Sequence, residues 1–249
     1  DNKIKLTHYL SKTSLRLVNG DTKKNEFIPF FFVSDKLAYE LDNTINYNED
    51  KPNSNLGQNS LRFNFTNYTT KVVSSNVLGY IEGSDPNLKD EIVILTAHYD
   101  HLGKMGEDVI FRGANDNASG VTMLLNLAKH YSIEENKPRF SMAFIAFAGE
   151  EAGLLGSSHY VQNPIFPLSD IEFLINLDIL GTGDEGITVV NGTVHPKKFE
   201  ALKGLNQQKG YLKLVKKRGE AAISDHYPFS EAGVPCFYIY TVGGIKAYH

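Results

Sequence analysis

The sequence predicts an α/β domain with a mixed, mainly parallel central sheet and helices on both of its faces. Two observations lead to this fold class. From residue 76 onward, short apolar segments alternate with segments of helical periodicity, and most of the apolar segments are continuous runs. Continuous apolar strands are buried on both faces, as in parallel sheets that helices cover on each side.

The individual elements follow from the same pattern. The candidate strands cover residues 77–81, 92–97, 140–148, 173–177, 187–190, 212–215 and 236–240. The candidate helices cover residues 118–131, 154–161 and 196–209. In the first helix, Val121, Leu124, Leu125 and Ala128 recur at helical spacing and give it one apolar face.

The first part of the chain has a different composition. Residues 28–33 are typical of a strand, residues 35–41 of a short helix, and residues 61–73 of a hairpin. Residues 42–55 are polar and rich in asparagine, as loops are. We therefore divide the chain into an N-terminal extension over residues 1–70 and a main domain over residues 71–249.

Length, charge and cysteine content exclude several function classes. The chain has 249 residues, a formal net charge of −4 and one cysteine, Cys236, which we expect to be a buried core residue. A weakly acidic chain without a basic stripe is not expected to bind nucleic acid, and no apolar run is long enough to span a bilayer. The chain starts at Asp1 without a signal-peptide pattern, so we expect a mature or trimmed chain.

The adjacent carboxylates Glu150 and Glu151 stand at the end of the apolar run 140–149. Two neighbouring carboxylates repel each other, and at the exit of a buried strand a cation or a proton must relieve that repulsion. The pair therefore suggests a metal site in which one glutamate binds the ion and the other transfers protons.

Other polar residues occupy equivalent places. His98 and Asp100 follow the strand 92–97, Asp178 follows the strand 173–177, and Asp116 precedes the first long helix. Ligands of open α/β sheets bind at the carboxyl ends of the strands. Each residue alone has an ordinary explanation, as a helix cap, a turn residue or a histidine beside a strand. Their convergence on one edge favours a metal site.

Four segments in this order resemble the co-catalytic zinc exopeptidases. They are residues 98–100 (His-Tyr-Asp), 113–120 (Gly-Ala-Asn-Asp-Asn-Ala-Ser-Gly), 149–157 (Gly-Glu-Glu-Ala-Gly-Leu-Leu-Gly-Ser) and 176–178 (Asn-Leu-Asp). That family includes secreted bacterial leucyl aminopeptidases, glutamate carboxypeptidase and glutaminyl cyclases. The resemblance extends from about residue 76 to residue 249, so the main domain is expected to be a zinc peptidase catalytic domain.

The resemblance implies two zinc ions bridged by Asp116. His98 and Asp178 would complete one site, and Glu151 would belong to the other. Glu150 would be the general base, and Asp100 would orient His98 by accepting its other ring N–H. Two zinc ions can clamp the attacking water and the scissile carbonyl together.

The second zinc needs a histidine, and there are two candidates, His226 in the polar segment 224–229 and His249. The resemblance favours His249, in the pair Tyr248-His249, and makes Tyr248 the hydroxyl that polarises the substrate carbonyl. Asp225 and His226 would then lie on the rim of the site or in its second shell. The four histidines outside the motif positions are expected at the surface or in the core: His101, His130, His159 and His195.

The resemblance also bears on the ends of the chain. Relatives continue past this last histidine, so either the chain is truncated or the domain closes differently. Residues 28–39 resemble the end of the protease-associated domain that some relatives carry, with an ordinary strand and helix as the alternative.

The expected function is that of an aminopeptidase that acts on peptides, secreted or periplasmic as its relatives are. One alternative is a glutaminyl cyclase-like transferase with one zinc, although those enzymes have a tryptophan-containing pocket and this chain has no tryptophan. The other alternative is a non-catalytic binding domain of the same fold.

Overall fold

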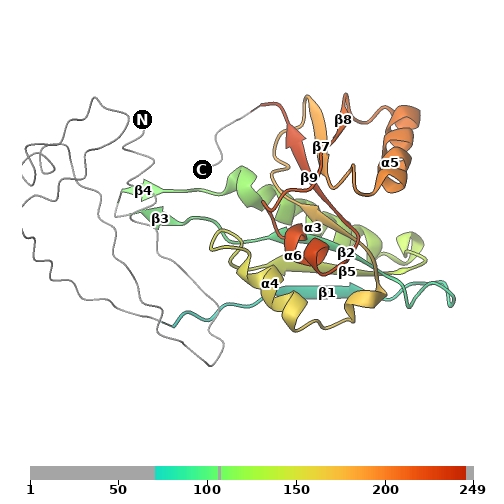
Figure 1. Cartoon of the computed structure of the whole chain (residues 1–249), viewed down its shortest axis with the longest axis horizontal. Helices are drawn as coiled ribbons and strands as arrows, with labels where there is room; N and C mark the ends of the chain where they lie inside the picture. The colour runs from blue at the N-terminus through green and yellow to red at the C-terminus, as the bar shows by residue number, and fades with distance from the viewer. Residues whose placement is uncertain (1–70, 106–107, 245–249) are drawn as a thin grey trace, which may run out of the picture. The chain divides into compact units, whose positions relative to one another are not determined.

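A seven-stranded sheet forms the centre of the part of the chain that the computed structural model describes, residues 71–105 and 108–244. Its strand order is β1-β5-β2-β6-β9-β7-β8 (Figure 1). The strands are β1 (Val77–Ile81), β2 (Ile92–His98), β5 (Ser141–Phe147), β6 (Ile171–Leu177), β7 (Gly186–Val190), β8 (Val215–Lys217) and β9 (Cys236–Val242).

The sheet is mixed and mainly parallel, which confirms the predicted fold class. Strands β5, β2, β6 and β9 are neighbours and run in the same direction. Strand β1 pairs antiparallel with β5, and β7 pairs antiparallel with β9, while β8 runs parallel to β7. The central strands β2, β5 and β6 are mostly buried, as their mainly apolar sequences predict.

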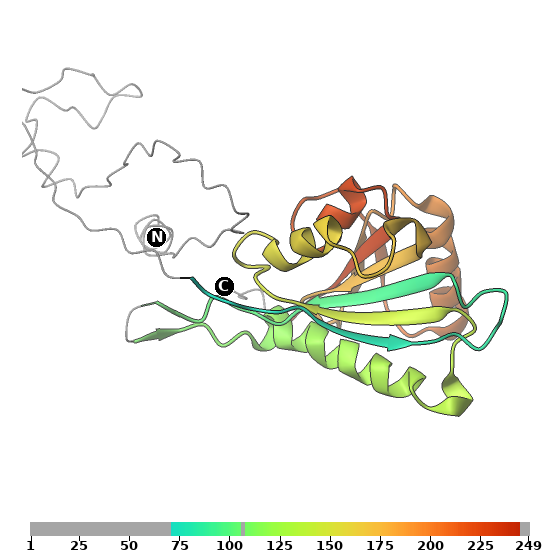
Figure 2. The same cartoon turned by 90° about the horizontal axis from the view of Figure 1, so that it is seen from below.

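Helices cover both faces of the sheet (Figure 2). Helix α3 (Ser119–Tyr131) packs on one face, where Leu124 joins a cluster with Leu95 and Phe144. Helices α4 (Leu155–Gln162) and α6 (His226–Glu231) cover the opposite face, which is also shown in Figure 2. Helix α5 (Pro196–Lys209) packs near the β8 end of the sheet.

The core under α4 and α6 is built around three aromatic rings. The ring of Phe147 lies 6.2 Å from that of Tyr160 and 5.9 Å from that of Phe229, centroid to centroid. All three residues are at most 3% exposed. Because Phe147 ends β5, this packing fixes the point from which the chain turns toward Glu150 and Glu151.

The predicted strand at residues 212–215 is wrong in its bounds, because β8 begins only at Val215. Helix α5 ends at Lys209, because the next residue, Gly210, has a φ of 67° that breaks the helix. The side chain of Asn206 then donates to the Leu212 oxygen and accepts from the Leu212 amide, at 2.9 and 2.8 Å. These bonds hold residue 212 against the helix end, so pairing with β7 starts later.

Several short elements are absent from the prediction. They are the hairpin of β3 (Lys104–Met105) and β4 (Val109–Ile110), the turns η1 (Ala114–Ala118), η2 (Glu134–Asn136) and η3 (Leu168–Asp170), and helix α6. The elements predicted within residues 1–70 lie outside the described residues, and residues 71–73 form no strand. None of the described helices has the length and apolar character that crossing a membrane requires.

Candidate metal centre

Three parallel strands bring polar side chains to one edge of the sheet. His98 is the last residue of β2 and pairs in register with Phe147, the last residue of β5. Glu150 and Glu151 follow β5 after a short turn, and Asp178 follows β6 directly. Since the three strands run in the same direction, all these side chains start from the same edge.

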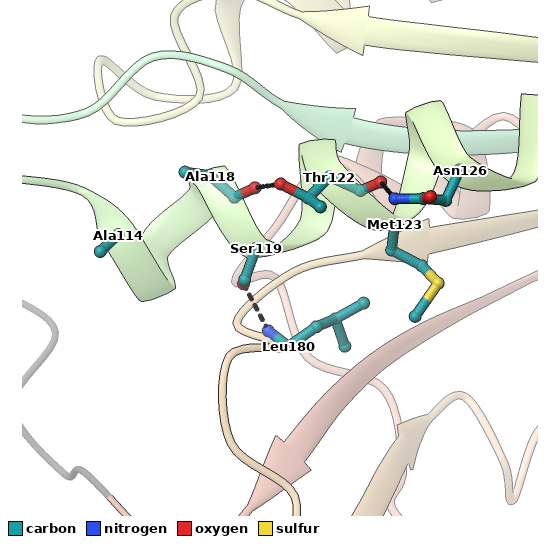
Figure 3. Close-up of a pocket in the computed structure, with 7 residues that line it drawn as sticks. All are labelled: Ala114, Ala118, Ser119, Thr122, Met123, Asn126 and Leu180. Carbon is teal, nitrogen blue, oxygen red and sulfur yellow. Dashed lines mark hydrogen bonds between the residues drawn. The ribbon is translucent and has the colours of Figure 1, made fainter. Parts of the chain in front are cut away.

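Asp116 reaches this edge through the η1 turn, which is hydrogen-bonded to the loop after β6. Three side chains accept the amides of three consecutive residues: Asn117 Oδ1 from Ile179 (3.2 Å), Ser119 Oγ from Leu180 (2.8 Å, Figure 3) and Asn115 Oδ1 from Gly181 (2.7 Å). Asn117 also donates to the Leu177 oxygen at 3.0 Å. We call these bonds the η1 clamp.

The η1 clamp determines where the Asp116 carboxylate lies. In the first turn of α3, Asn117 Oδ1 accepts the Gly120 amide at 2.9 Å, so this capping bond belongs to Asn117. Asp116 is 5% exposed and its carboxylate faces His98. The clamp therefore holds Asp116 and Asp178 next to the same imidazole nitrogen, Nε2 of His98.

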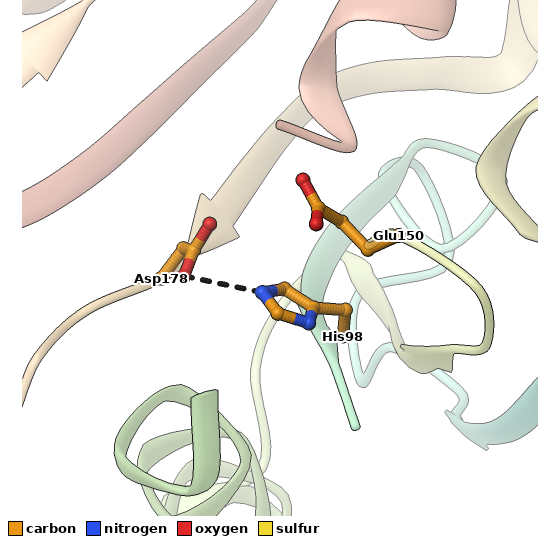
Figure 4. Close-up of side chains that lie close together, drawn as sticks. All are labelled: His98, Glu150 and Asp178. Carbon is orange, nitrogen blue, oxygen red and sulfur yellow. Dashed lines mark hydrogen bonds and ion pairs between the residues drawn. The ribbon is translucent and has the colours of Figure 1, made fainter. Parts of the chain in front are cut away.

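His98 contacts both carboxylates, and Figure 4 shows its contact with Asp178. Its Nε2 lies 3.2 Å from Asp116 Oδ1 and 3.3 Å from Asp178 Oδ1, and the residue is 1% exposed. Burial acts to lower the pKa of His98, but contacts with Asp100, Asp116 and Asp178 outweigh burial and raise that pKa. A single nitrogen thus faces two buried carboxylates, an arrangement that a divalent cation between them would satisfy.

Glu150 lies beside His98 and Asp178, and one donor atom from each of the three lies within 4.8 Å of the others. Burial raises the pKa of the Glu150 carboxyl to about 9; the negative charges of Asp225, Asp178 and Glu151 add to the rise and His98 opposes it. In Figure 4 the Glu150 carboxyl lies across a space from Asp178, above the His98 ring. Without a metal ion the Glu150 carboxyl therefore holds a proton at neutral pH, and a cation beside it would lower its pKa.

Asp100 fixes the turn that carries the two glutamates. Its Oδ1 accepts the Glu150 amide at 3.1 Å, and its Oδ2 accepts the Glu151 amide at 3.2 Å. The ring Nδ1 of His98 lies 3.1 Å from the Asp100 backbone oxygen and 3.7 Å from Oδ1. The backbone oxygen is thus the nearer partner of the His98 N–H, and the carboxylate serves mainly the glutamate turn.

Glu151 belongs to a second cluster, together with Asp116 and His101. Its Oε1 lies 2.8 Å from His101 Nδ1, and the two side chains are 10% and 11% exposed. Adjacent glutamates thus serve different groups, because Glu150 joins His98 and Asp178 while Glu151 joins His101 and Asp116. Asp116 is shared, since it also contacts His98.

A chain of buried hydrogen bonds orients Asp178. Thr96 Oγ1 donates to Asn176 Oδ1, Asn176 Nδ2 donates to Ser224 Oγ, and Ser224 Oγ donates to Asp178 Oδ2, each at 2.7 Å. Thr96, Asn176 and Ser224 are all 0% exposed. With Oδ2 bound to Ser224, Asp178 directs Oδ1 toward His98.

Asp225 and His226 are buried near Asp178. They are 0% and 1% exposed, so of the two predicted places an exposed rim does not apply, and a place in the second shell stays a prediction. Asp225 precedes α6, and His226 is its first residue. Burial raises the pKa of Asp225 to about 7, although a 2.6 Å hydrogen bond from Ser157 Oγ lowers it. Burial lowers the pKa of His226 to about 4, and its ring lies 5.2 Å from that of Tyr238.

An open groove adjoins the centre along the first half of α3 (Figure 3). It is lined by Ala114, Ala118, Ser119, Thr122, Met123, Asn126 and Leu180. Ala114 and Leu180 each lie two positions from a carboxylate of the centre, Asp116 and Asp178. The groove thus borders the η1 clamp and presents mostly apolar side chains.

A comparison with known families matches peptidase family M28 over residues 76–249, well over half of the chain. The chain belongs to peptidase family M28. This membership confirms the resemblance that the four sequence segments carry, and the matched range includes every residue of both clusters.

Individual relatives agree with the family. This M28 chain is 35% identical to aminopeptidase YwaD of Bacillus subtilis over 180 residues, which are 68% of this chain and 35% of that protein. The structure of BSAP, a zinc aminopeptidase from Bacillus subtilis, matches with a TM-score of 0.54 at 33% identity, over 66% of this chain and 39% of that one. The chain thus spans about a third to two fifths of these aminopeptidases.

A glutaminyl cyclase from an Acidobacteriales bacterium also matches, with a TM-score of 0.57 at 24% identity, over 70% of this chain and 60% of that one. At that identity the match shows a shared fold alone. It therefore does not favour the transferase alternative.

The M28 domain brings together His98, Asp116, Glu150, Glu151 and Asp178, with Asp100 next to them. Tyr248 and His249 lie outside the described residues. Sequence reasoning missed the place of His101 and of Ser224. The sequence analysis names Asp225 and His226, which directly follow Ser224, as candidate site residues. No pattern in the sequence marks His101.

Proposed function

We propose that this M28 domain is the catalytic domain of a zinc-dependent aminopeptidase that hydrolyses N-terminal peptide bonds with two zinc ions. The observation that carries the proposal is the separation of Glu150 and Glu151 into two clusters that share one edge and the neighbouring Asp116. A hydrolase of this kind needs a carboxylate for the metal and another for the proton, and the two clusters offer both.

The side chains of both clusters are of the types that bind zinc. Imidazole and carboxylate are zinc ligands, and two donors that share a tetrahedral zinc at about 2.0–2.1 Å lie roughly 3.3 Å apart. The distances of 3.2 and 3.3 Å from His98 Nε2 to Asp116 and Asp178 agree with that value. In the proposal, His98, Asp116 and Asp178 hold one zinc, and Asp116, Glu151 and His249 hold the other.

Bound zinc would supply a Lewis acid for the substrate carbonyl and would lower the pKa of a water. Glu150 accepts the proton of the attacking water and delivers it to the leaving amine. Its place supports this role, because one donor atom from each of Glu150, His98 and Asp178 lies within 4.8 Å of the others. Asp100 holds the Glu150 amide and so fixes the direction from which the carboxyl enters the site.

The hydrogen-bonded chain that ends at Ser224 fixes Asp178 with one oxygen toward His98. The η1 clamp fixes Asp116 against the same imidazole. A centre that is rigid before substrate binds keeps the reacting groups aligned, and misalignment of about 1 Å can cost roughly 100-fold in rate. Tyr248 is proposed as the hydroxyl that polarises the substrate carbonyl.

The aminopeptidase assignment rests on the names of relatives that this chain covers only in part. YwaD is named an aminopeptidase, and BSAP is described as a zinc aminopeptidase. The substrates are proposed to be peptides with a free N-terminus. A secreted or periplasmic location stays a prediction, which fractionation of the source cells would check.

The test is the variant Glu150→Gln, assayed with an aminoacyl amide and by zinc count. We expect activity to fall by about 10²–10⁴-fold, the usual share of a general base, while two zinc ions stay bound. Glu200→Gln, on the exposed surface of α5, is the matched control and should keep full activity. Full activity of Glu150→Gln, or no hydrolysis by the wild-type protein with zinc loaded, would refute the proposal.

A further inference from the structure

His101 lies inside the metal centre, although the sequence placed it at the surface or in the core. Its Nδ1 is 2.8 Å from Glu151 Oε1, and it shares a cluster with Asp116 and Glu151. The side chain is 11% exposed, so the imidazole is largely enclosed. An imidazole in direct contact with a carboxylate of the centre requires a functional explanation as well as a structural one.

Gly113 and Phe111 both lie close to the His101 side chain. Gly113 has a φ of 66°, and a Cβ placed there would lie 3.1 Å from the Cβ and Cγ atoms of His101. The ring of Phe111 stands edge-on to the imidazole, with 6.5 Å between the centroids. The absence of a side chain at Gly113 thus leaves the space that the imidazole needs to reach Glu151.

The distance between His101 Nδ1 and Glu151 Oε1 bears on whether His101 is a metal ligand or a residue that contacts a metal ligand. Donors that share a tetrahedral zinc are roughly 3.3 Å apart, as His98 is from its two carboxylates. The 2.8 Å between His101 Nδ1 and Glu151 Oε1 is shorter and is typical of an ion pair between an imidazole and a carboxylate. A carboxylate has two oxygens, so Glu151 can contact His101 with one and bind an ion with the other.

We propose that His101 is a positioning residue for the second metal, and that it holds the Glu151 carboxylate in the orientation that binds the ion. This inference rests on the proposed two-zinc function and assigns a role to a residue outside the family motif. His101 acts through Glu151 and does not itself touch the ion. Partners that orient metal-binding carboxylates typically contribute 10- to 100-fold to metal affinity.

The test is a zinc titration of the metal-free full chain against a chromophoric chelator, with zinc counted by mass spectrometry. In His101→Ala we expect the weaker zinc equivalent to bind roughly 10- to 100-fold more weakly, while the first equivalent is unchanged. His101→Gln keeps a side-chain N–H near Glu151 and should recover most of that affinity. His130→Ala, an exposed histidine on α3, is the matched control and should bind as the wild type does.

Two results would overturn the inference. Wild-type affinity for both equivalents in His101→Ala would show that His101 does not support the second metal. Equal loss in His101→Ala and His101→Gln, with one imidazole ligand missing from the cobalt-substituted spectrum, would make His101 a ligand. Thermal melting of the metal-free variants checks that they are folded, and His101→Gln serves as the readout if His101→Ala is not.

Different results would contradict the proposed two-zinc function and the proposed role of His101. A wild-type protein that binds a single zinc would contradict the two-zinc function itself. Two zinc ions in wild type and in every variant, with equal affinities, would contradict the role of His101 alone.

Discussion

Removing the Asn176 side chain should destabilise the protein strongly, because Asn176 is the middle member of the buried chain that orients Asp178. In Asn176→Ala, Thr96 loses the acceptor of its hydroxyl, and Ser224 loses the donor to its oxygen. Both partners are 0% exposed, so water cannot replace either bond without entering the core. Ser224 can still donate to Asp178.

The magnitude follows from these two bonds. A buried polar group left without its partner costs about 1–3 kcal/mol, so the two groups together give about 2–6 kcal/mol of lost unfolding free energy. For a domain of this size, each 1 kcal/mol lowers Tm by about 2–4 °C. The smallest expected decrease in Tm is therefore about 4 °C.

The assay is urea unfolding and thermal melting of Asn176→Ala beside Asn126→Ala. Asn126 is exposed on α3, and its removal should change the unfolding free energy by no more than about 0.5 kcal/mol. In a Thr96→Val background the cost of Asn176→Ala should fall by about 1 kcal/mol or more, because no hydroxyl is left without its acceptor. Equal stability of Asn176→Ala and Asn126→Ala, or strictly additive costs in the double variant, would refute the reasoning.

Two further predictions concern residues outside the reaction. Gly120→Ala should destabilise by about 1–3 kcal/mol in urea unfolding, since its Cβ would overlap Asn117 and the Leu177 backbone oxygen. Gly204→Ala, where a Cβ would meet nothing within 4 Å on helix α5, should instead stabilise by about 0.5–1 kcal/mol, and the reverse order would contradict the packing. Burial raises the pKa of the Cys236 thiol to about 11, so at pH 8 iodoacetamide should label it far more slowly in the native protein than in denaturant. Rapid labelling of the native thiol would show that Cys236 is not enclosed.

The central strands were predictable because their mainly apolar sequences are typical of strands buried on both faces of a sheet. The runs that form β2, β5 and β6 are mostly apolar, which predicts burial on both faces. The parallel order of these strands then predicts that His98, Glu150 and Asp178 start from one edge. This step needs no knowledge of side-chain packing.

The rest depends on contacts between distant segments. Strand β8 begins late because the Asn206 side chain binds Leu212, and no periodic pattern encodes that bond. Helix α6 has only six residues and contains Pro228, so helical spacing cannot be detected in it. His101 lies near Glu151 because Gly113 leaves space for its ring, which depends on how the chain returns a dozen residues later.

The η1 clamp has a consequence for the order in which the protein is assembled. It joins residues that are 60 to 66 positions apart in the sequence. The pair of Asp116 and Asp178 therefore does not exist on a nascent or unfolded chain, and metal uptake follows folding. Since the clamp consists of bonds between protein atoms alone, it persists when the ion leaves. Exchange of one divalent ion for another should then proceed in the folded protein, without refolding.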